Sequence, residues 1–161
     1  MRYFAYGSNM DRGDLKLWCK HNGYKEVRFL EEPKAAKLDD WELVFDYYSM
    51  GRGGGAANIR PARDKNVYGL LLDVSEQDFA TIATKEGAPN FYEQVKPDIE
   101  VTLMKGGILV REVKTFKVVK KREQKEMQVP TKEYMKLLLD NAIHNRFPVA
   151  YVKMLRNIPV K

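Results

Sequence analysis

The sequence contains few of the side chains that build metal or redox centres. Its 161 residues include one cysteine, Cys19, and two histidines, His21 and His144. A single cysteine excludes an internal disulfide, and Cys19 and His21 have no second pair of ligands at a zinc-binding spacing. No apolar run approaches the roughly 20 residues of a membrane span. We therefore expect no metal site and no membrane span, and we expect Cys19 to lie in the core.

Acidic residues are in the minority, but the excess of basic residues is spread along the chain. Lys and Arg number 28 against 22 Asp and Glu, which gives a net charge of +6. The densest basic run, residues 117–125, soon includes an acid, so we expect a solvated strand end and loop. Nucleic-acid binding remains an alternative function, and such a protein would bind DNA or RNA with an affinity that falls steeply as the salt concentration rises.

Length and composition are those of an ordinary globular domain. With 44% hydrophobic residues, 161 residues are enough to bury one core, so we expect a single domain over residues 1–161. The chain has no charged-then-apolar leader at its start, so a cytoplasmic location is the default expectation. Nothing in the sequence indicates an oligomeric state.

Hydrophobic periodicity predicts helices at the start, middle and end of the chain, with strands between them. A first helix is expected over residues 11–21, and Ser75 and Thr131 are good N-cap residues for two more. A short closing helix over residues 149–158 is an open alternative. Strands are expected over residues 24–30, 41–48, 56–59, 67–74, 91–104 and 108–119. This order predicts an α+β fold with a mostly antiparallel sheet curled into a small β-barrel flanked by helices.

The first ten residues carry the most specific local signal. Tyr3 to Tyr6 is a short aromatic segment typical of a strand, and it stops at Gly7, Ser8 and Asn9 before the first helix. A strand, a glycine turn and a helix start bring several backbone N–H groups together, which favours an anion-binding turn. The same composition is also typical of a plain tight turn.

The segment Tyr-Phe-Ala-Tyr-Gly-Ser-Asn-Met at residues 3–10 resembles the signature of the γ-glutamylcyclotransferase family. A second segment, Ala-Thr-Lys-Glu-Gly at 83–87 followed by Tyr92, is similar to the Glu-Gly…Tyr segment of that family. Weaker similarities are the Gly-Gly-Ala-Ala segment from residue 54, the strand at 67–73, and Tyr134 before Asn-Arg-Phe-Pro at 145–148. In order, they span residues 3 to about 148.

The resemblance implies a compact mixed β-barrel with helices and a cofactor-free reaction on a small γ-glutamyl compound. In that reaction the α-amine attacks the γ-carbonyl, which yields 5-oxoproline and a free amine. It assigns Glu86 the role of catalytic acid/base. It also assigns substrate binding to the residues at the N-terminal turn and to the late tyrosine: Tyr3, Phe4, Ala5, Tyr6, Gly7, Ser8, Asn9 and Tyr134. Because Glu86 is expected at the C-terminal end of a helix, the helix dipole would raise the pKa of its carboxyl.

Three expectations stand beside this interpretation. The first is that Arg60 pairs with a substrate carboxylate, and the second is that the loop Gly51–Gly55 acts as a specificity lid. The third is an alternative function: a binding or regulatory module with the same fold that recognises a glutamyl-like molecule without turnover.

Overall fold

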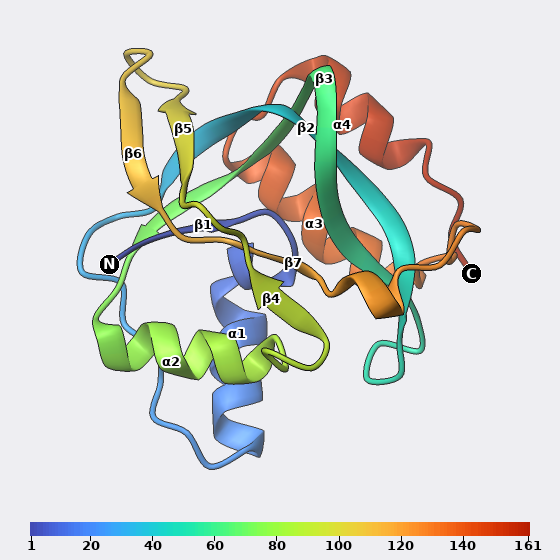
Figure 1. The fold of residues 1–161 in the computed structure, drawn as a ribbon, viewed down its shortest axis with the longest axis horizontal. Helices are drawn as coiled ribbons and strands as arrows, with labels where there is room; N and C mark the ends of the chain where they lie inside the picture. The colour runs from blue at the N-terminus through green and yellow to red at the C-terminus, as the bar shows by residue number, and fades with distance from the viewer.

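Two long antiparallel strands, β2 (Lys34–Ser49) and β3 (Gly54–Asp73), form the centre of the fold (Figure 1). The computed structural model describes residues 1–161. The sheet has the order β1-β3-β2-β5-β6, with β1 (Arg2–Ala5), β5 (Ile99–Leu103) and β6 (Leu109–Val113). A second sheet pairs β4 (Tyr92–Gln94) with β7 (Phe116–Val118). All strand pairs within both sheets are antiparallel, so the mixed α+β expectation is confirmed.

The five-stranded sheet is open, so the expected barrel is not confirmed. Its edge strands are β1 and β6, and no ladder joins them. They approach through one isolated parallel bridge between Tyr3 and Lys114, in which Lys114 accepts from the Phe4 N–H and donates to the Arg2 carbonyl. The sheet therefore curls until its edges touch at one point.

Four helices cover the sheets, and local capping explains where three of them begin. They are α1 (Arg12–His21), α2 (Glu76–Lys85), α3 (Lys132–His144) and α4 (Val149–Arg156). The N-cap side chains of Asp11, Ser75 and Thr131 each accept a hydrogen bond from a backbone N–H three residues later. In Figure 1, α1 and α2 lie together below the sheet, whereas α3 and α4 lie behind β2 and β3. None of these helices has both the length and the apolar character to cross a bilayer.

One cluster of buried hydrophobic side chains joins the sheets to the helices. Phe4, Ile59 and Leu72 have no exposed surface. At Gly69, an added Cβ would lie 2.3 Å from the Ala5 carbonyl oxygen, so the close approach of β1 to β3 requires glycine. This contact fixes the end of β1, from which the N-terminal turn departs. Cys19 lies in the same core, as expected.

The strand boundaries differ from the expected ones at five places, the first being that β2 begins at Lys34 rather than at residue 41. Residues 24–30 form no strand, and the two strands expected at 56–59 and 67–74 are one continuous strand, β3. Pro61 sits inside β3 because its partner Trp41 lies at a register shift, where the ladder is already interrupted. The long strands expected at 91–104 and 108–119 are each broken in two. Pro97, which has no backbone N–H, lies in the first break, and Val113 and Phe116 are three residues apart across the second, so both breaks interrupt the strand pattern.

Candidate active site

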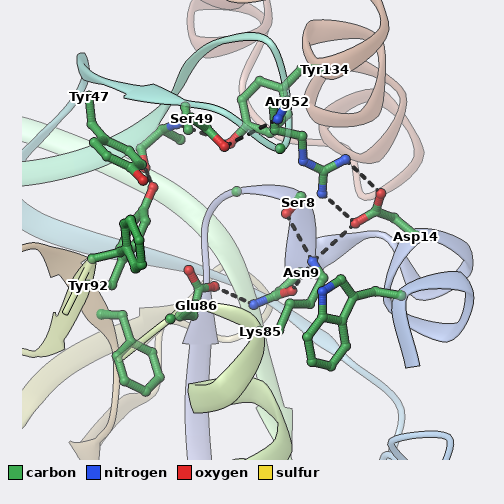
Figure 2. Close-up of a pocket in the computed structure, with 18 of the residues that line it drawn as sticks. Ser8, Asn9, Asp14, Tyr47, Ser49, Arg52, Lys85, Glu86, Tyr92 and Tyr134 are labelled. Atoms are coloured by element: carbon green, nitrogen blue, oxygen red, sulfur yellow. Dashed lines mark hydrogen bonds and ion pairs between the residues drawn. The ribbon is translucent and has the colours of Figure 1, made fainter. Parts of the chain in front are cut away.

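A cavity of about 570 Å³ lies where the N-terminal turn meets the end of α2 (Figure 2). Its 23 lining residues come from segments that are far apart in the sequence: β1 and the turn after it, α1, the β2–β3 hairpin, the end of α2, β4, β7 and α3. The cavity therefore exists only in the folded chain.

The N-terminal turn continues into a short 3-10 helix, Ser8–Met10, which leads into α1. The Gly7 carbonyl accepts from the Met10 N–H at 3.0 Å, and the Ser8 carbonyl accepts from the Asp11 N–H at 2.9 Å. The Gly7 N–H has no acceptor, and Gly7 lines the cavity. The turn thus has a backbone donor available for an oxygen of a bound molecule.

Glu86 is the C-cap residue of α2 and also lines the cavity. Asn9 Nδ2 donates a short hydrogen bond to Glu86 Oε1 and a second one to the Tyr3 hydroxyl at 3.1 Å. Burial raises the pKa of the Glu86 carboxyl above its ordinary value of 4.5, although the charges of Lys85 and Arg52 and the Tyr3 hydroxyl act in the opposite direction. A carboxyl with a raised pKa exchanges protons closer to neutral pH.

Asp14, Arg52 and Lys85 form one side of the cavity, called here the charged wall (Figure 2). Arg52 donates to both carboxylate oxygens of Asp14, at 2.9 and 2.7 Å, and Lys85 Nζ donates to Asp14 Oδ2 at 3.1 Å. Lys85 Nζ also donates to Asn9 Oδ1 at 2.7 Å and to Ser8 Oγ at 3.2 Å. The positive charges of Arg52 and Lys85 and the negative charge of Asp14 give this wall one net positive charge.

The pKa of Asp14 is low because of these partners. Burial alone would raise it, but the hydrogen bond and charge of Arg52 and the charge of Lys85 outweigh burial and lower it from 3.8. Asp14 therefore stays ionised and holds the two cations, one from the β2–β3 hairpin and one from the end of α2.

Two tyrosine hydroxyls bind the backbone of Ala57 in β3. In β2, Val44 pairs with Asn58 and Tyr47 pairs with Ala56, so a bulge leaves Ala57 opposite two residues. The Tyr134 hydroxyl accepts from the Ala57 N–H at 3.0 Å, and the Tyr92 hydroxyl donates to the Ala57 carbonyl at 2.8 Å. Burial raises the pKa of Tyr134 to about 12, so its hydroxyl keeps its proton at neutral pH.

Tyr47, Phe91 and Tyr92 form the other side of the cavity, called here the aromatic wall. The rings of Tyr47 and Tyr92 meet edge to face with their centroids 5.7 Å apart. In Figure 2, Tyr47 and Tyr92 lie on one side of Glu86, and Arg52 and Asp14 lie on the other. Glu86 thus stands between a charged and an aromatic surface.

Most of the residues expected from the sequence meet in this cavity. Glu86 lines it together with Tyr3, Tyr6, Gly7, Ser8, Asn9 and Tyr134. Phe4 and Ala5 do not line it, because both side chains are fully buried in the core. Arg60 is also elsewhere: it is bonded to Glu42 on the exposed face of the β2–β3 pair. Gly51 and Arg52 bring the expected lid loop to the cavity edge.

The sequence analysis missed the charged wall and Tyr47. Asp14 and Arg52 are 38 residues apart and Asp14 and Lys85 are 71 apart, so no local pattern connects them. Lys85 could have been noted as the neighbour of Glu86. No three His, Cys, Asp or Glu side chains lie close enough together to hold a metal ion.

Comparisons with known proteins show the family of the chain. The model of the AIG2-like family matches residues 66–155, more than half of the chain. The chain belongs to the AIG2-like family. The match includes Glu86 and Tyr134, whereas the N-terminal turn lies before it. No protein of curated function matches the sequence.

This chain also has the fold of solved γ-glutamyl cyclotransferases. A protein named gamma-glutamyl cyclotransferase superimposes with a TM-score of 0.81 at 21% identity, over 100% of this chain and 89% of the other. An uncharacterized protein from Homo sapiens gives 0.80 at 22% identity, over 99% and 88%. A yeast γ-glutamyl cyclotransferase specific to glutathione gives 0.61 at 11% identity, over 96% and 95%. The family resemblance expected from the sequence is thereby confirmed, and at these identities the likeness shows the fold.

Proposed function

We propose that this protein is a cofactor-free γ-glutamyl cyclotransferase. The substrate α-amine attacks its own γ-carbonyl carbon, a lactam C–N bond forms, and the C–N bond to the leaving amine breaks. The products are 5-oxoproline and the free amine. Nucleophile and electrophile belong to one molecule, so the protein's task is to fold the substrate, move one proton and stabilise the oxyanion.

Glu86 is the acid/base in this proposal. The α-ammonium first loses one proton to solvent. As a carboxylate, Glu86 then accepts the second proton, which the attacking nitrogen loses as the lactam forms, and as an acid it gives that proton to the leaving nitrogen. Because the pKa of Glu86 is raised, the free-energy difference between its protonated and ionised forms is smaller at neutral pH. The hydrogen bond from Asn9 orients the carboxyl group toward the N-terminal turn.

Two donors at the turn are suited to the substrate oxygens. The Gly7 N–H has no acceptor within the protein, and the Tyr134 hydroxyl accepts from Ala57 but donates to no protein atom. By contrast, the Tyr6 and Tyr92 hydroxyls donate to the backbone carbonyls of Phe116 and Ala57. We therefore assign Tyr134 to the substrate, and Tyr6 and Tyr92 to the support of the cavity. The net positive charge of the charged wall favours the α-carboxylate on that side.

The observation that carries the proposal is the hydrogen bond between Asn9 and Glu86 inside the cavity. It joins Glu86 to the N-terminal turn, although 77 residues separate Asn9 from Glu86, and so supports the roles proposed for them. The family and the fold agree with this function. The cytoplasmic location stays a prediction.

Release of 5-oxoproline from γ-glutamyl dipeptides and γ-glutamyl amines tests the proposal. Glu86→Gln keeps the shape of the side chain and removes the base, so we expect a loss of roughly 10²–10⁴-fold in rate. Glu126→Gln, at an exposed acid outside the cavity, is the matched control and should keep the wild-type rate. Wild-type turnover by Glu86→Gln would contradict the assignment. Calorimetric binding of γ-glutamyl compounds without any release of 5-oxoproline would instead support a non-catalytic binding module.

A further inference from the structure

The mouth of the cavity carries apolar surface that the cyclisation itself does not use. Leu17 on α1, Met50 in the β2–β3 hairpin and Phe91 after α2 all line the cavity, and their exposed fractions are 53%, 86% and 40%. Three exposed apolar side chains from three separate segments thus border one opening. Such surface at a cavity mouth favours contact with an apolar part of a ligand.

Phe91 is held in place although it is exposed. Gly87 has φ +68°, and an added Cβ there would lie 2.7 Å from the Phe91 ring, so the ring packs directly on the backbone beside Glu86. The Arg122 guanidinium also lies 4.1 Å from the ring centroid, and its Nε donates to the Asn90 carbonyl. The aromatic wall therefore presents a fixed ring next to the proposed acid/base.

The cations that line the cavity are already engaged. Arg52 and Lys85 are the only Lys or Arg residues among the lining residues, and both are bonded to Asp14. His21, the remaining basic residue, is exposed at the end of α1. The charged wall has one net positive charge, which matches the single α-carboxylate of a γ-glutamyl group. A second carboxylate on the leaving group would face Glu86 and the aromatic wall, where no lining residue is an unpaired cation; Arg122 lies against Phe91 but does not line the cavity.

We propose that the preferred substrates are γ-glutamyl amides of neutral, apolar amines, with the leaving group packed against Phe91, Met50 and Leu17. This inference rests on the proposed cyclotransferase function and adds a leaving-group class to it. The glutamyl end lies toward the charged wall, the scissile amide beside Glu86, and the apolar amine toward the cavity mouth.

A pair of substrates that differ by one carboxylate tests the inference. γ-Glutamyl-phenethylamide and γ-glutamyl-phenylalanine have the same ring and the same scissile bond. We expect kcat/KM for 5-oxoproline release to be at least about tenfold higher for the phenethylamide, since loss of one unpaired charge in a partly desolvated site is worth that much or more. An equal or higher value for γ-glutamyl-phenylalanine overturns the inference and leaves the proposed function standing. No release from either substrate, with none from γ-glutamyl-glycine, overturns both.

Two variants test which residues set the preference. For the wild type, kcat/KM for γ-glutamyl-phenethylamide can be divided by kcat/KM for γ-glutamyl-methylamide. Phe91→Ala should lower this ratio by about fivefold or more. Leu30→Ala removes another exposed apolar side chain that does not line the cavity, and should leave the ratio unchanged. Met50→Arg adds a cation at the mouth and should raise kcat/KM for γ-glutamyl-phenylalanine relative to the phenethylamide, whereas Met50→Leu should not. Unchanged ratios in both Phe91→Ala and Met50→Arg, with melting temperatures near wild type, would refute the assigned contacts.

Discussion

The two walls of the cavity differ in how they are held. On the charged wall, Asp14, Arg52 and Lys85 satisfy one another, and no buried side-chain nitrogen or oxygen in the protein lacks a partner. On the aromatic wall, Phe91 has 40% of its surface exposed. One side is thus fixed by directional bonds and suits a constant group, while the other offers non-directional surface and suits a variable one. A shared glutamyl handle and differing leaving amines fit this division.

Removal of the Lys85 ammonium should break the charged wall most severely. Its side chain is only 6% exposed and its Nζ donates to Ser8, Asn9 and Asp14. We expect Lys85→Met to lower the free energy of unfolding by about 3 kcal/mol, because the partly buried Asp14 carboxylate and the Asn9 amide lose a partner together. Urea unfolding measures this. Lys136→Met, at an exposed pair with Asp140, should lower it by less than about 1 kcal/mol. An equal loss of unfolding free energy in Lys85→Met and Lys136→Met would contradict the expected difference between the buried and the exposed lysine.

Neutralisation of Asp14 should cost less and should depend on pH. Since the folded-state pKa of Asp14 is lowered from 3.8, its charge contributes stability that is present above pH 3.8 and lost as the pH falls through the folded-state pKa. Asp14→Asn should therefore be less stable than wild type at pH 7, by about 2 kcal/mol for charge-assisted hydrogen bonds. The difference should shrink toward acid pH in denaturant unfolding measured from pH 7 to pH 3. A constant difference over that range would show that the charge is not responsible.

Ala57 is bound both by Tyr92 of the aromatic wall and by Tyr134, whose ring lies under Arg52 of the charged wall, which allows a matched pair of tyrosine variants. Tyr134→Phe leaves the Ala57 N–H without an acceptor, and Tyr92→Phe leaves the Ala57 carbonyl without that donor. Each should destabilise the protein by about 1–2 kcal/mol, as expected for an unpaired buried backbone group. Only Tyr134→Phe should also lower kcat by more than tenfold, since only that hydroxyl has a proton available for the substrate. Similar kcat values for the two variants would remove Tyr134 from the site.

The smallest expected effect is a gain of stability at Glu86. Burial raises its pKa above 4.5, so ionisation of Glu86 opposes folding once the pH exceeds that value. Glu86→Gln should then be slightly more stable than wild type at pH 8, and this advantage should vanish as the pH falls to 4.5 and below. Thermal melts at pH 4 and pH 8 test the sign. A variant less stable than wild type at pH 8 would indicate that the bond from Asn9 outweighs desolvation.

Local signals predicted the parts of the molecule that depend on neighbouring residues. Ser75 and Thr131 were recognisable as caps, and Glu86 was expected at a helix end because Gly87 follows it. Which of the adjacent residues Tyr47 and Tyr48 lines the cavity could not be predicted in this way. The β2 bulge shifts the alternation of side chains by one residue, so Tyr47, opposite Ala56, shares the face of Val44. The charged wall depends on ion pairs between distant segments, which no local periodicity encodes.

The tyrosine contacts at Ala57 give the protein a natural spectroscopic probe. The Ala57 amide hydrogen is bound to a hydroxyl whose own proton is assigned to the substrate, so polarisation of that hydroxyl passes directly to one backbone signal. In a ¹H–¹⁵N correlation spectrum, this single resonance follows occupancy of the glutamyl end of the cavity. It does so without an added chromophore or any catalytic turnover.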